Sequence, residues 1–370
     1  MARCAIRARE RFEGISIVIY QGNCIDVMRR LIDDGVKVQS CVTSPPYWGL
    51  RNYNCEGQLG LESTPEQYVA KMTEVFSLVF QLLHDDGTLW LNLGDSYAGG
   101  GRGGGSLDCK QRTNVGSLVK APKWSEASGL KAKDLVGIPW LVAFALRSAG
   151  WYLRMDIIWS KPNPMPESVT DRPTKAHEYI FLMSKSKQYY YNHEAIKEPG
   201  VWDIDGSGTL ARKDRAREDQ KSAPTEMKNG IRGSVFKDAK AYDGKHSRQD
   251  KQRGHSRRHA GFNERLDAMG KQEQCSGMRN KRSVWEIVPF NYKEAHFATY
   301  PPKLIEPCIL AGSRPGDIIL DPFNGSGTTG MVAYQHGREY IGIELNSEYI
   351  SLSEKRMSNV QVDMLTSAQL

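Results

Sequence analysis

The hexapeptide Thr43–Trp48 combines residue types that can hold an amino group and a planar ring. It follows an apolar run that predicts a strand, and two consecutive prolines end a strand rigidly because proline cannot donate to a sheet. Ser44 and the carbonyl of Pro45 could accept hydrogen bonds from an amine, and Pro46 fixes the backbone ahead of Tyr47. Tyr47 and the tryptophan after it offer flat faces to a ring. The hexapeptide therefore predicts an amine-binding site, although it also fits a structural strand end with buried aromatics.

A second motif follows another predicted strand, which ends at Asp321. Gly325, Gly327 and Gly330 fit the pattern G-x-G-x-x-G between a strand and a helix, and Glu344 ends the following strand. In such a cradle the glycines let the backbone approach a nucleotide, and the carboxylate accepts hydrogen bonds from ribose hydroxyls. Asp321 would repel a pyrophosphate, so a cationic group such as an amino acid's ammonium suits this position better. The motif lacks Gly-Lys-Ser/Thr, which argues against ATP.

The two motifs together favour one ligand and one reaction. A ribose at Glu344 and an amino-acid end near Asp321 describe S-adenosylmethionine, whose sulfonium carries an electrophilic methyl group. The hexapeptide at Ser44 can present a nucleophilic amine to that methyl. Both motifs end strands, and adjacent strands of one parallel sheet would bring them together at its carboxyl edge although they lie far apart in the chain.

Composition excludes several classes of protein. The sequence has 370 residues, of which 39% are hydrophobic and 25% charged, as in a soluble globular protein. Its longest apolar run, 135–146, is too short for a membrane span and contains Pro139. No apolar segment follows the N-terminal arginines, so we expect no signal peptide and a cytoplasmic location. The seven cysteines include no Cys-x-x-Cys pair, and neither a disulfide framework nor a metal site is predicted.

Positive charge is concentrated in one segment. The net charge is +7, and residues 201–283 hold 20 Lys and Arg against 12 Asp and Glu, so the rest of the chain is nearly neutral. Apolar periodicity is also lost there, which predicts a domain boundary. A local basic excess is typical of a surface that binds a polyanion, although a solvated insert would show the same composition.

Strand and helix patterns alternate through the rest of the chain. Strands are predicted at 15–20, 38–43, 88–93, 152–159, 178–183, 188–191, 317–321 and 339–344. Helices are predicted at 25–31, 65–85, 139–149, 302–311 and 347–357, and another follows the glycine motif and ends at about 336. This alternation predicts an α/β fold with a parallel sheet covered by helices. Seven residues at 99–105 include six glycines, and we expect a mobile loop over about 98–133.

The combination of motifs resembles the β class of DNA amino-methyltransferases, in which the catalytic motif precedes the cofactor motif. The resemblance covers nearly everything outside 201–283. It implies a Rossmann-like S-adenosylmethionine-dependent methyltransferase fold, with a mostly parallel seven-stranded sheet, a closing antiparallel hairpin and a circularly permuted motif order. It also implies three parts: a catalytic half at 1–200, a target-recognition insert at 201–283, and a cofactor-binding half at 284–370.

The resemblance also implies which residues form the site. Ser44, Pro45, Pro46 and Tyr47 match the catalytic motif. The cofactor-binding set is Asn23, Cys24, His296, Phe297, Ala298, Thr299, Asp321, Pro322, Phe323, Gly325, Ser326, Gly327, Thr328 and Glu344. The target-base pocket is expected to include Trp48, Trp159, Lys161, Asn163 and His177. Asn23 departs from the family, which usually has Gly-Asp where this sequence has Gly-Asn.

The implied reaction is methyl transfer to the exocyclic amine of a base flipped out of double-stranded DNA. Serine at the first catalytic position is commoner in the N4-cytosine branch, which favours cytosine, and N6-adenine is the alternative. A homodimer and a cognate restriction endonuclease are compatible with the resemblance. More distant alternatives are a dinucleotide-dependent oxidoreductase, a methyltransferase for RNA or protein, and a non-catalytic DNA-binding protein. A carbon-5 cytosine enzyme would need a thiolate, and Cys308 lies in a predicted apolar helix instead.

Overall fold

The structure is a computed structural model that describes residues 6–12, 15–50, 53, 55–98, 129–200, 202–204, 210–212, 278–289 and 300–358. The chain divides into two compact units, one formed by Met1–Ile196 with Arg282–Leu370 and the other by Lys197–Lys281. Most of the expected glycine-rich loop, most of the basic insert, and His296, Phe297, Ala298 and Thr299 lie outside the described residues. Their assignments stay predictions.

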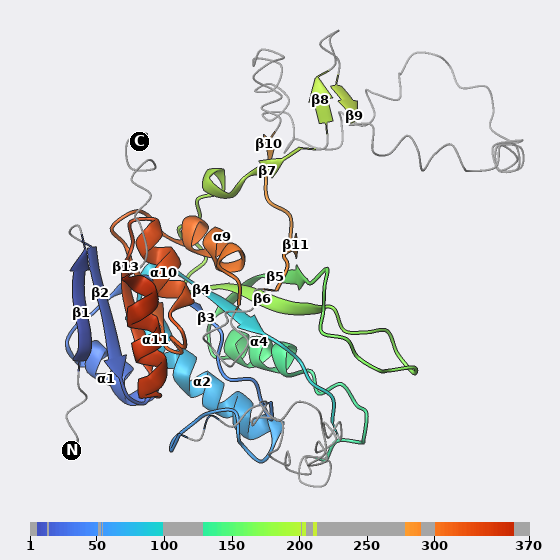
Figure 1. Ribbon diagram of the computed structural model, residues 1–370, viewed down its shortest axis with the longest axis horizontal. Coiled ribbons are helices and arrows are strands. Elements are labelled where there is room, and N and C mark those ends of the chain that lie inside the picture. Colours follow the sequence, from blue (N-terminus) through green and yellow to red (C-terminus); the bar gives the residue numbers. More distant parts are fainter. Residues whose placement is uncertain are drawn as a thin grey trace, which may run out of the picture. The chain divides into compact units, whose positions relative to one another are not determined.

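The first unit is built on a nine-stranded sheet (Figure 1). Its strands, in spatial order, are β1 (Ile6–Phe12), β2 (Ile15–Gln21), β13 (Glu339–Glu344), β12 (Ile318–Asp321), β3 (Val38–Thr43), β4 (Leu83–Leu93), β6 (His177–Ser184), β5 (Tyr152–Ser160) and β11 (Val284–Glu286). The pairs from β2 to β4 are parallel, whereas β6 is antiparallel to both β4 and β5. The mostly parallel α/β fold is therefore confirmed.

Two features of the sheet differ from the prediction. The sheet has nine strands rather than seven, because β1 pairs antiparallel with β2 and β11 pairs parallel with β5 at the opposite edge. The closing hairpin is formed by β5 and β6, and the predicted strand at 188–191 does not form. Tyr190 N there donates to the carbonyl of Asp86, and Asn192 N donates to the carbonyl of Ala311. These backbone groups bond to residues of β4 and α9 without forming a strand pairing.

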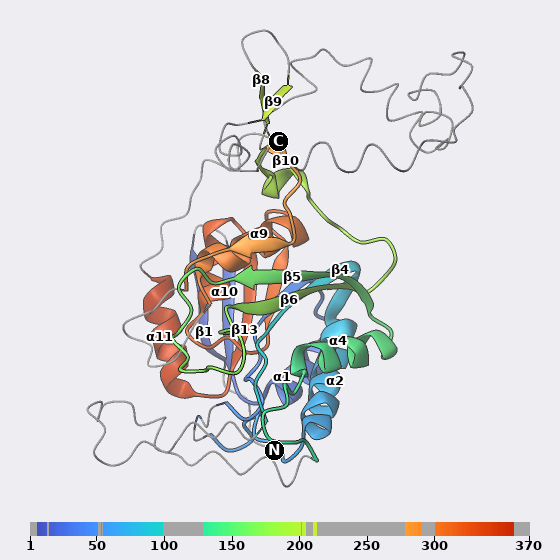
Figure 2. The same cartoon turned by 90° about the vertical axis from the view of Figure 1, so that its right-hand side faces the viewer.

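Helices cover both faces of the sheet (Figures 1 and 2). One layer contains α1 (Cys24–Asp33), α2 (Pro65–Leu82) and α4 (Ile138–Ser148), and the other contains α9 (Pro302–Gly312), α10 (Thr328–Gln335) and α11 (Ser347–Met357). Side chains of the central strands alternate between the two layers. In β4, Leu89 and Leu91 pack with α1, α2 and α4, and Trp90 packs with α9. The core thus consists of two hydrophobic clusters, one on each face of the sheet.

The starts of two helices agree with the sequence signals. Thr64 Oγ1 accepts a hydrogen bond from Gln67 N, and Pro65 occupies the first position of α2. Asn23 Oδ1 accepts from Ile25 N and begins α1 in the same way. The α2 helix ends at Leu82, three residues before the predicted end, because β4 already begins at Leu83. None of the described helices is long and apolar enough to cross a membrane.

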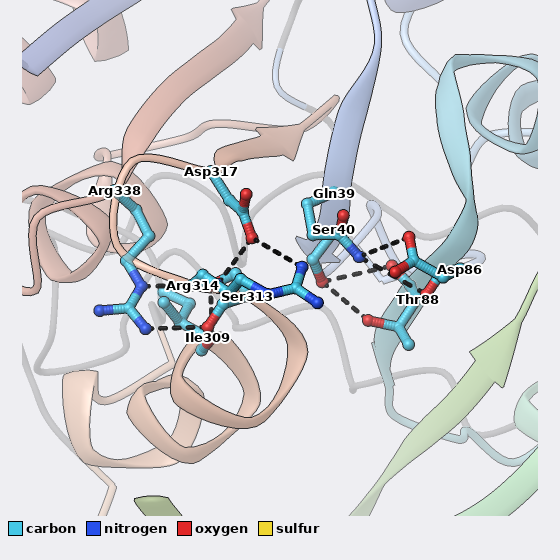
Figure 3. A network of polar contacts seen from close by, with 9 residues as sticks. All are labelled: Gln39, Ser40, Asp86, Thr88, Ile309, Ser313, Arg314, Asp317 and Arg338. Carbon is cyan, nitrogen blue, oxygen red and sulfur yellow. Dashed lines mark hydrogen bonds and ion pairs between the residues drawn. The ribbon is translucent and has the colours of Figure 1, made fainter. Parts of the chain in front are cut away.

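Two groups of polar contacts lie near the end of α9, one between β3 and β4 and the other around Ser313 (Figure 3). Ser40 and Thr88 bond across these strands at 3.1 Å between their hydroxyl oxygens. A Cβ atom on Gly312, the last residue of α9, would lie 2.9 Å from each of these hydroxyls. Nearby, the buried Arg338 donates to both the hydroxyl and the carbonyl oxygen of Ser313. The glycine therefore permits the helix to lie directly against the sheet.

The second unit contains two short antiparallel pairs in its described residues. Strands β7 (Glu198–Pro199) and β10 (Met278–Arg279) pair with each other, and Arg279 Nε donates to Glu198 Oε1 at 2.9 Å. Strands β8 (Trp202–Ile204) and β9 (Leu210–Arg212) form the other pair.

Candidate active site

A cavity of about 850 Å³ lies in the first unit, where the carboxyl ends of β2, β13, β12 and β3 meet. This size is in the range of small-molecule sites, which hold roughly 300–1,000 Å³. Both predicted motifs contribute to its wall. Ser44 to Tyr47 line it from the end of β3, and Pro322 to Ser326 line it from the end of β12. The structure therefore brings together two motifs that lie at opposite ends of the chain.

Glu344, at the end of β13, lines the nucleotide side of the cavity. Its Oε2 accepts a hydrogen bond from Gly325 N at 2.7 Å, and its Oε1 accepts from Asn346 N at 2.8 Å. Burial raises the pKa of Glu344, and these backbone bonds oppose that shift. Each oxygen keeps a second lone pair, so the carboxylate can still accept a hydrogen bond from a ribose hydroxyl.

The three glycines of the motif have different tasks. Gly325, with φ of 51°, lines the cavity, and a Cβ there would meet no atom closer than 3.9 Å. Gly327 was expected to contact the cofactor, but a Cβ on it would lie 2.1 Å from Ser353 Oγ in α11. A Cβ on Gly330 would lie 2.4 Å from Met357 in the same helix. These two glycines permit close helix packing, whereas Gly325 leaves the backbone open to a ligand.

Asp321, the last residue of β12, is fully buried and does not line the cavity. Its Oδ1 accepts from Thr43 Oγ1 at 2.6 Å and from Phe323 N at 3.0 Å. Its Oδ2 accepts from Thr329 Oγ1 at 2.7 Å and from Tyr300 OH at 3.2 Å. Burial raises the pKa of this carboxyl, and the four hydrogen bonds oppose the shift. The geometry corrects the expected contact with an ammonium group: Asp321 instead ties the cofactor loop to the residue preceding Ser44.

Two residues predicted to lie near the adenine line the cavity. Asn23 and Cys24 line it, at the start of α1. The oxygen of Asn23 caps that helix, which explains how asparagine serves in a position where the family usually has aspartate. Burial raises the pKa of Cys24 to about 12, so this residue contributes a neutral thiol. Phe323, Ser326 and Thr328 complete the expected wall, with Pro322 beside them.

Ser44 and Tyr47 share a hydrogen-bond partner in β4. Asn92 Nδ2 lies 3.3 Å from Ser44 Oγ and 2.8 Å from the Tyr47 hydroxyl oxygen. The Tyr47 hydroxyl donates to Glu178 Oε2 at 2.6 Å, and Asn92 Nδ2 reaches the same oxygen at 3.2 Å. Burial raises the pKa of Tyr47, and the Glu178 carboxylate raises it further. The Tyr47 hydroxyl is therefore held as a neutral group.

The ring of Tyr47 lies against Gly94, which follows the end of β4. A Cβ on Gly94 would lie only 2.5 Å from Tyr47 Cε2. The hydroxyl bonds hold the far end of the ring, so both its position and its tilt are determined. Pro46 contributes a further constraint, because its carbonyl accepts from the Tyr68 hydroxyl at 2.9 Å. Tyr47 is thus presented to the cavity by rigid contacts on several sides.

Three of the five residues expected in a base pocket line the cavity. Trp159, Lys161 and Asn163 line the cavity. Trp48 does not line it, because its ring is 4% exposed in the hydrophobic core and its Nε1 donates to the carbonyl of Glu62 at 2.9 Å. His177 also lies outside the lining, and its ring packs edge-on against Tyr179. The expectations for Trp48 and His177 as pocket residues are therefore corrected.

Asn92 was not predicted as a site residue, and Glu178 was predicted only as the neighbour of His177 in a segment that resembles the lining of the base pocket. Asn92 is the one polar residue in the apolar run 89–93, which was a usable signal. Glu178 lies on β6 next to His177, and its carboxylate accepts from Tyr47, Asn92 and Lys161. In the described ranges, no three His, Cys, Asp or Glu side chains gather in a way that could hold a metal ion.

The cavity fits S-adenosylmethionine by the chemistry of its walls. Glu344 offers acceptors for a ribose, Gly325 leaves the backbone open, and Asn23 lies at the adenine end. Tyr300 also lines the cavity beside the cofactor loop. A nucleotide cradle and an amine-binding turn at one edge of a mostly parallel sheet define a methyltransferase that depends on this cofactor.

Comparison with known proteins identifies the family. Residues 38–355 match the model of the N6 and N4 methyltransferases described as DNA methylase, and the chain belongs to this family. It is 38% identical over 347 residues to the Type II methyltransferase M.Cfr9I of Citrobacter freundii, covering 94% of this chain and 89% of that one. It is 43% identical to M.SmaI of Serratia marcescens, covering 85% and 82%.

A solved structure agrees on the fold. The PvuII DNA methyltransferase, described as cytosine-N4-specific, matches 95% of this chain and 90% of its own, with a TM-score of 0.51 and 17% identity. This similarity concerns the fold alone. The family model and the relatives confirm the predicted family, its DNA methyltransferase activity and its cofactor S-adenosylmethionine. The solved structure confirms the methyltransferase fold.

Proposed function

We propose that this chain transfers a methyl group to the N4 amine of a cytosine flipped out of double-stranded DNA. The observation that carries the proposal is the meeting of Ser44 and Tyr47 with Glu344 and Gly325 in one cavity. The bond from Thr43 to Asp321 fixes the two halves relative to each other, although these residues are 278 positions apart. An amine held at Ser44 therefore lies beside the cofactor cradle.

The residues of the first motif orient the amine. Ser44 Oγ and the Pro45 carbonyl accept its two hydrogens, which turns the nitrogen lone pair out of conjugation and toward the cofactor. The bound cofactor supplies the electrophilic methyl group. The nitrogen–carbon bond forms as the sulfur–carbon bond breaks, and the nitrogen then releases one proton. Catalysis rests on position and electrostatics, so no covalent link to the protein is required.

Tyr47 holds the ring of the target base. One side of the tyrosine ring is occupied by Gly94, and its hydroxyl is fixed by Asn92 and Glu178. A flipped base stacked on the remaining face would gain aromatic contact and keep its amine at Ser44. The basic excess at 201–283 supports duplex DNA as the partner, because phosphate contacts supply most of the sequence-independent affinity.

Serine at position 44 supports cytosine. By the resemblance to β-class enzymes, serine at that position is commoner in the N4-cytosine branch and aspartate in the N6-adenine branch. Sequencing of modified bases in DNA from cells that express the chain tests the base and the recognition sequence together. Detection of N6-methyladenine without N4-methylcytosine would overturn the cytosine assignment and leave amine methylation intact.

Substitution of Ser44 tests the assigned mechanism. Ser44→Ala should lower kcat by about 10²–10³-fold, as loss of one positioned polar group does elsewhere, with little change in cofactor affinity. Equilibrium binding of S-adenosylmethionine checks the affinity. Ser351→Ala, at an exposed position on α11, is the matched control and should be active. Full activity of Ser44→Ala would contradict the assignment.

A further inference from the structure

Lys161 is a cation in the wall of the cavity whose hydrogen-bonding capacity is only partly used. Its side chain is 20% exposed and its ammonium is paired with Glu178 Oε1. The nitrogen also lies 4.3 Å from the centre of the Trp159 ring. Glu178 is the one hydrogen-bond acceptor found for this ammonium in the described part of the chain. An ammonium has three N–H donors, so two remain for a ligand.

The position of this ammonium is determined by the catalytic residues. Glu178 binds Lys161 through one carboxylate oxygen and the Tyr47 hydroxyl through the other. Asn92 links that hydroxyl to Ser44. The Trp159 ring is itself fixed, because its Nε1 donates to the carbonyl of Ile287 at 2.8 Å. The Glu178 carboxylate thus holds the ammonium of Lys161 at a fixed position relative to Tyr47, the residue that stacks on the base.

We propose that Lys161 reads the target base by donating hydrogen bonds to O2 and N3 of cytosine. This inference rests on the proposed cytosine function. With its amine at Ser44, a flipped base presents the rest of its Watson–Crick edge to the pocket wall. Cytosine offers two acceptors there, N3 and O2. Adenine offers N1 alone, followed by a C2–H group that cannot accept a hydrogen bond.

The carboxylate of Glu178 does not compete for the base. Three donors, from Tyr47, Asn92 and Lys161, already bind it. Its task is to position Lys161 and Tyr47 with respect to each other. An adenine in the pocket would leave a half-buried ammonium facing a C–H group, which is unfavourable because the cation has lost water without gaining an acceptor. Lys161 therefore selects cytosine, because an adenine in the pocket would leave its N–H donors without acceptors.

The first test measures base preference. Once the recognition sequence is known, duplexes with cytosine or adenine at the target position are compared by kcat/KM. Lys161→Met should reduce the cytosine-to-adenine ratio at least about tenfold, as expected for loss of a matched base contact. Lys161→Met/Glu178→Gln avoids an unpaired buried carboxylate and should show the same reduction. An unchanged ratio in both variants, with equal losses on both bases, would overturn the inference, since a structural or phosphate-binding lysine would affect both equally.

Lys185 provides a matched control. Its ammonium is also paired with a carboxylate, Asp85, at 3.2 Å, lies 5.4 Å from the centre of the Phe80 ring, and is 17% exposed. It follows the far end of β6, away from the cavity lining. Lys185→Met should keep the base ratio of the wild type. A change in that ratio as large as for Lys161→Met would mean that the effect is not specific to the pocket.

The second test addresses the atom that is read. A target 2-thiocytosine replaces O2 by a weaker acceptor and should slow the wild type by about tenfold. Lys161→Met should show a smaller additional loss on this substrate than on cytosine, because only the N3 contact remains at full strength. Additive losses would contradict the assignment to O2. If the wild type forms N6-methyladenine instead, the proposed cytosine function fails whatever these variants do, so the two failures are distinguishable.

Discussion

Gly94→Ala should impair methyl transfer by displacing the ring of Tyr47. The new Cβ would lie 2.5 Å from Tyr47 Cε2 and 3.0 Å from Cδ2. Carbon atoms pack at about 3.5–4.0 Å, so the ring or the backbone must move by about 1 Å. The ring cannot simply swing away, since its hydroxyl is bound to Glu178 and Asn92. Displacement therefore strains or breaks these bonds.

The expected effect is about a 10²-fold loss of kcat/KM, which is typical of a displacement of about 1 Å at a reacting group. The cofactor cradle is built from β12 and β13, so the dissociation constant for S-adenosylmethionine should stay near that of the wild type. Methylation of a duplex is measured under single-turnover conditions, and cofactor binding is measured by titration. Circular dichroism confirms that the variant is folded.

Gly312→Ala is the matched control for Gly94→Ala. Its Cβ would lie 2.8 Å from Trp90 Nε1, at the amino-terminal edge of the strands. It should lower the unfolding free energy by about 1–3 kcal/mol through overpacking and leave kcat/KM of the folded enzyme unchanged. Wild-type kcat/KM for Gly94→Ala would refute the reasoning that Tyr47 must be held in this position.

Three further substitutions test other parts of the site. Glu344→Gln should weaken cofactor binding at least about tenfold. The amide NH₂ of glutamine can face the N–H of Gly325, and two donors cannot form a hydrogen bond with each other. Burial raises the pKa of Glu344. As the solution is acidified, the affinity of the wild type for the cofactor should therefore begin to fall at a higher pH than it would for an exposed glutamate. Titration with the cofactor at several pH values checks this. Asp321→Asn should lower the unfolding free energy by about 1–3 kcal/mol, since an NH₂ would oppose donors such as Thr43; an unchanged melting midpoint would contradict it. Cys308→Ala should retain methyl transfer at a cost of about 1 kcal/mol in stability, and an inactive but folded variant would point to a thiol nucleophile.

The sequence predicted the bounds of helices and strands best where residues that end such elements, such as proline, flank an apolar run. The strand at 38–43 has the predicted bounds because prolines follow soon after it, and the strand at 339–344 and the helix at 347–357 also agree. The edge strand β1 was missed, since Ile6–Phe12 alternates with arginines and gives no apolar signal. Residues 188–191 have the aromatics of a strand, but Tyr190 makes a single backbone bond to Asp86 of β4 and no strand pairing forms.

The site was predictable as motifs and not as contacts. Neighbouring residues point in different directions, so the sequence could not tell that Tyr47 faces the cavity and Trp48 the core. Glu178 and Asn92 stand alone on separate strands, and their joint role depends on the order of the sheet. Asp321 belonged to a recognised motif, yet its task became visible only once four donors were seen around it.

The order of the strands has a consequence for synthesis of the protein. β2 and β3 are consecutive in the chain, but β13 and β12 lie between them in the sheet. A nascent chain that has reached only β6 therefore has two separate sheet fragments with a gap two strands wide. Closing this gap requires contacts of very high sequence separation, which are slow to form. The cavity can be completed only after Glu344 has left the ribosome, so unfinished chains cannot methylate DNA.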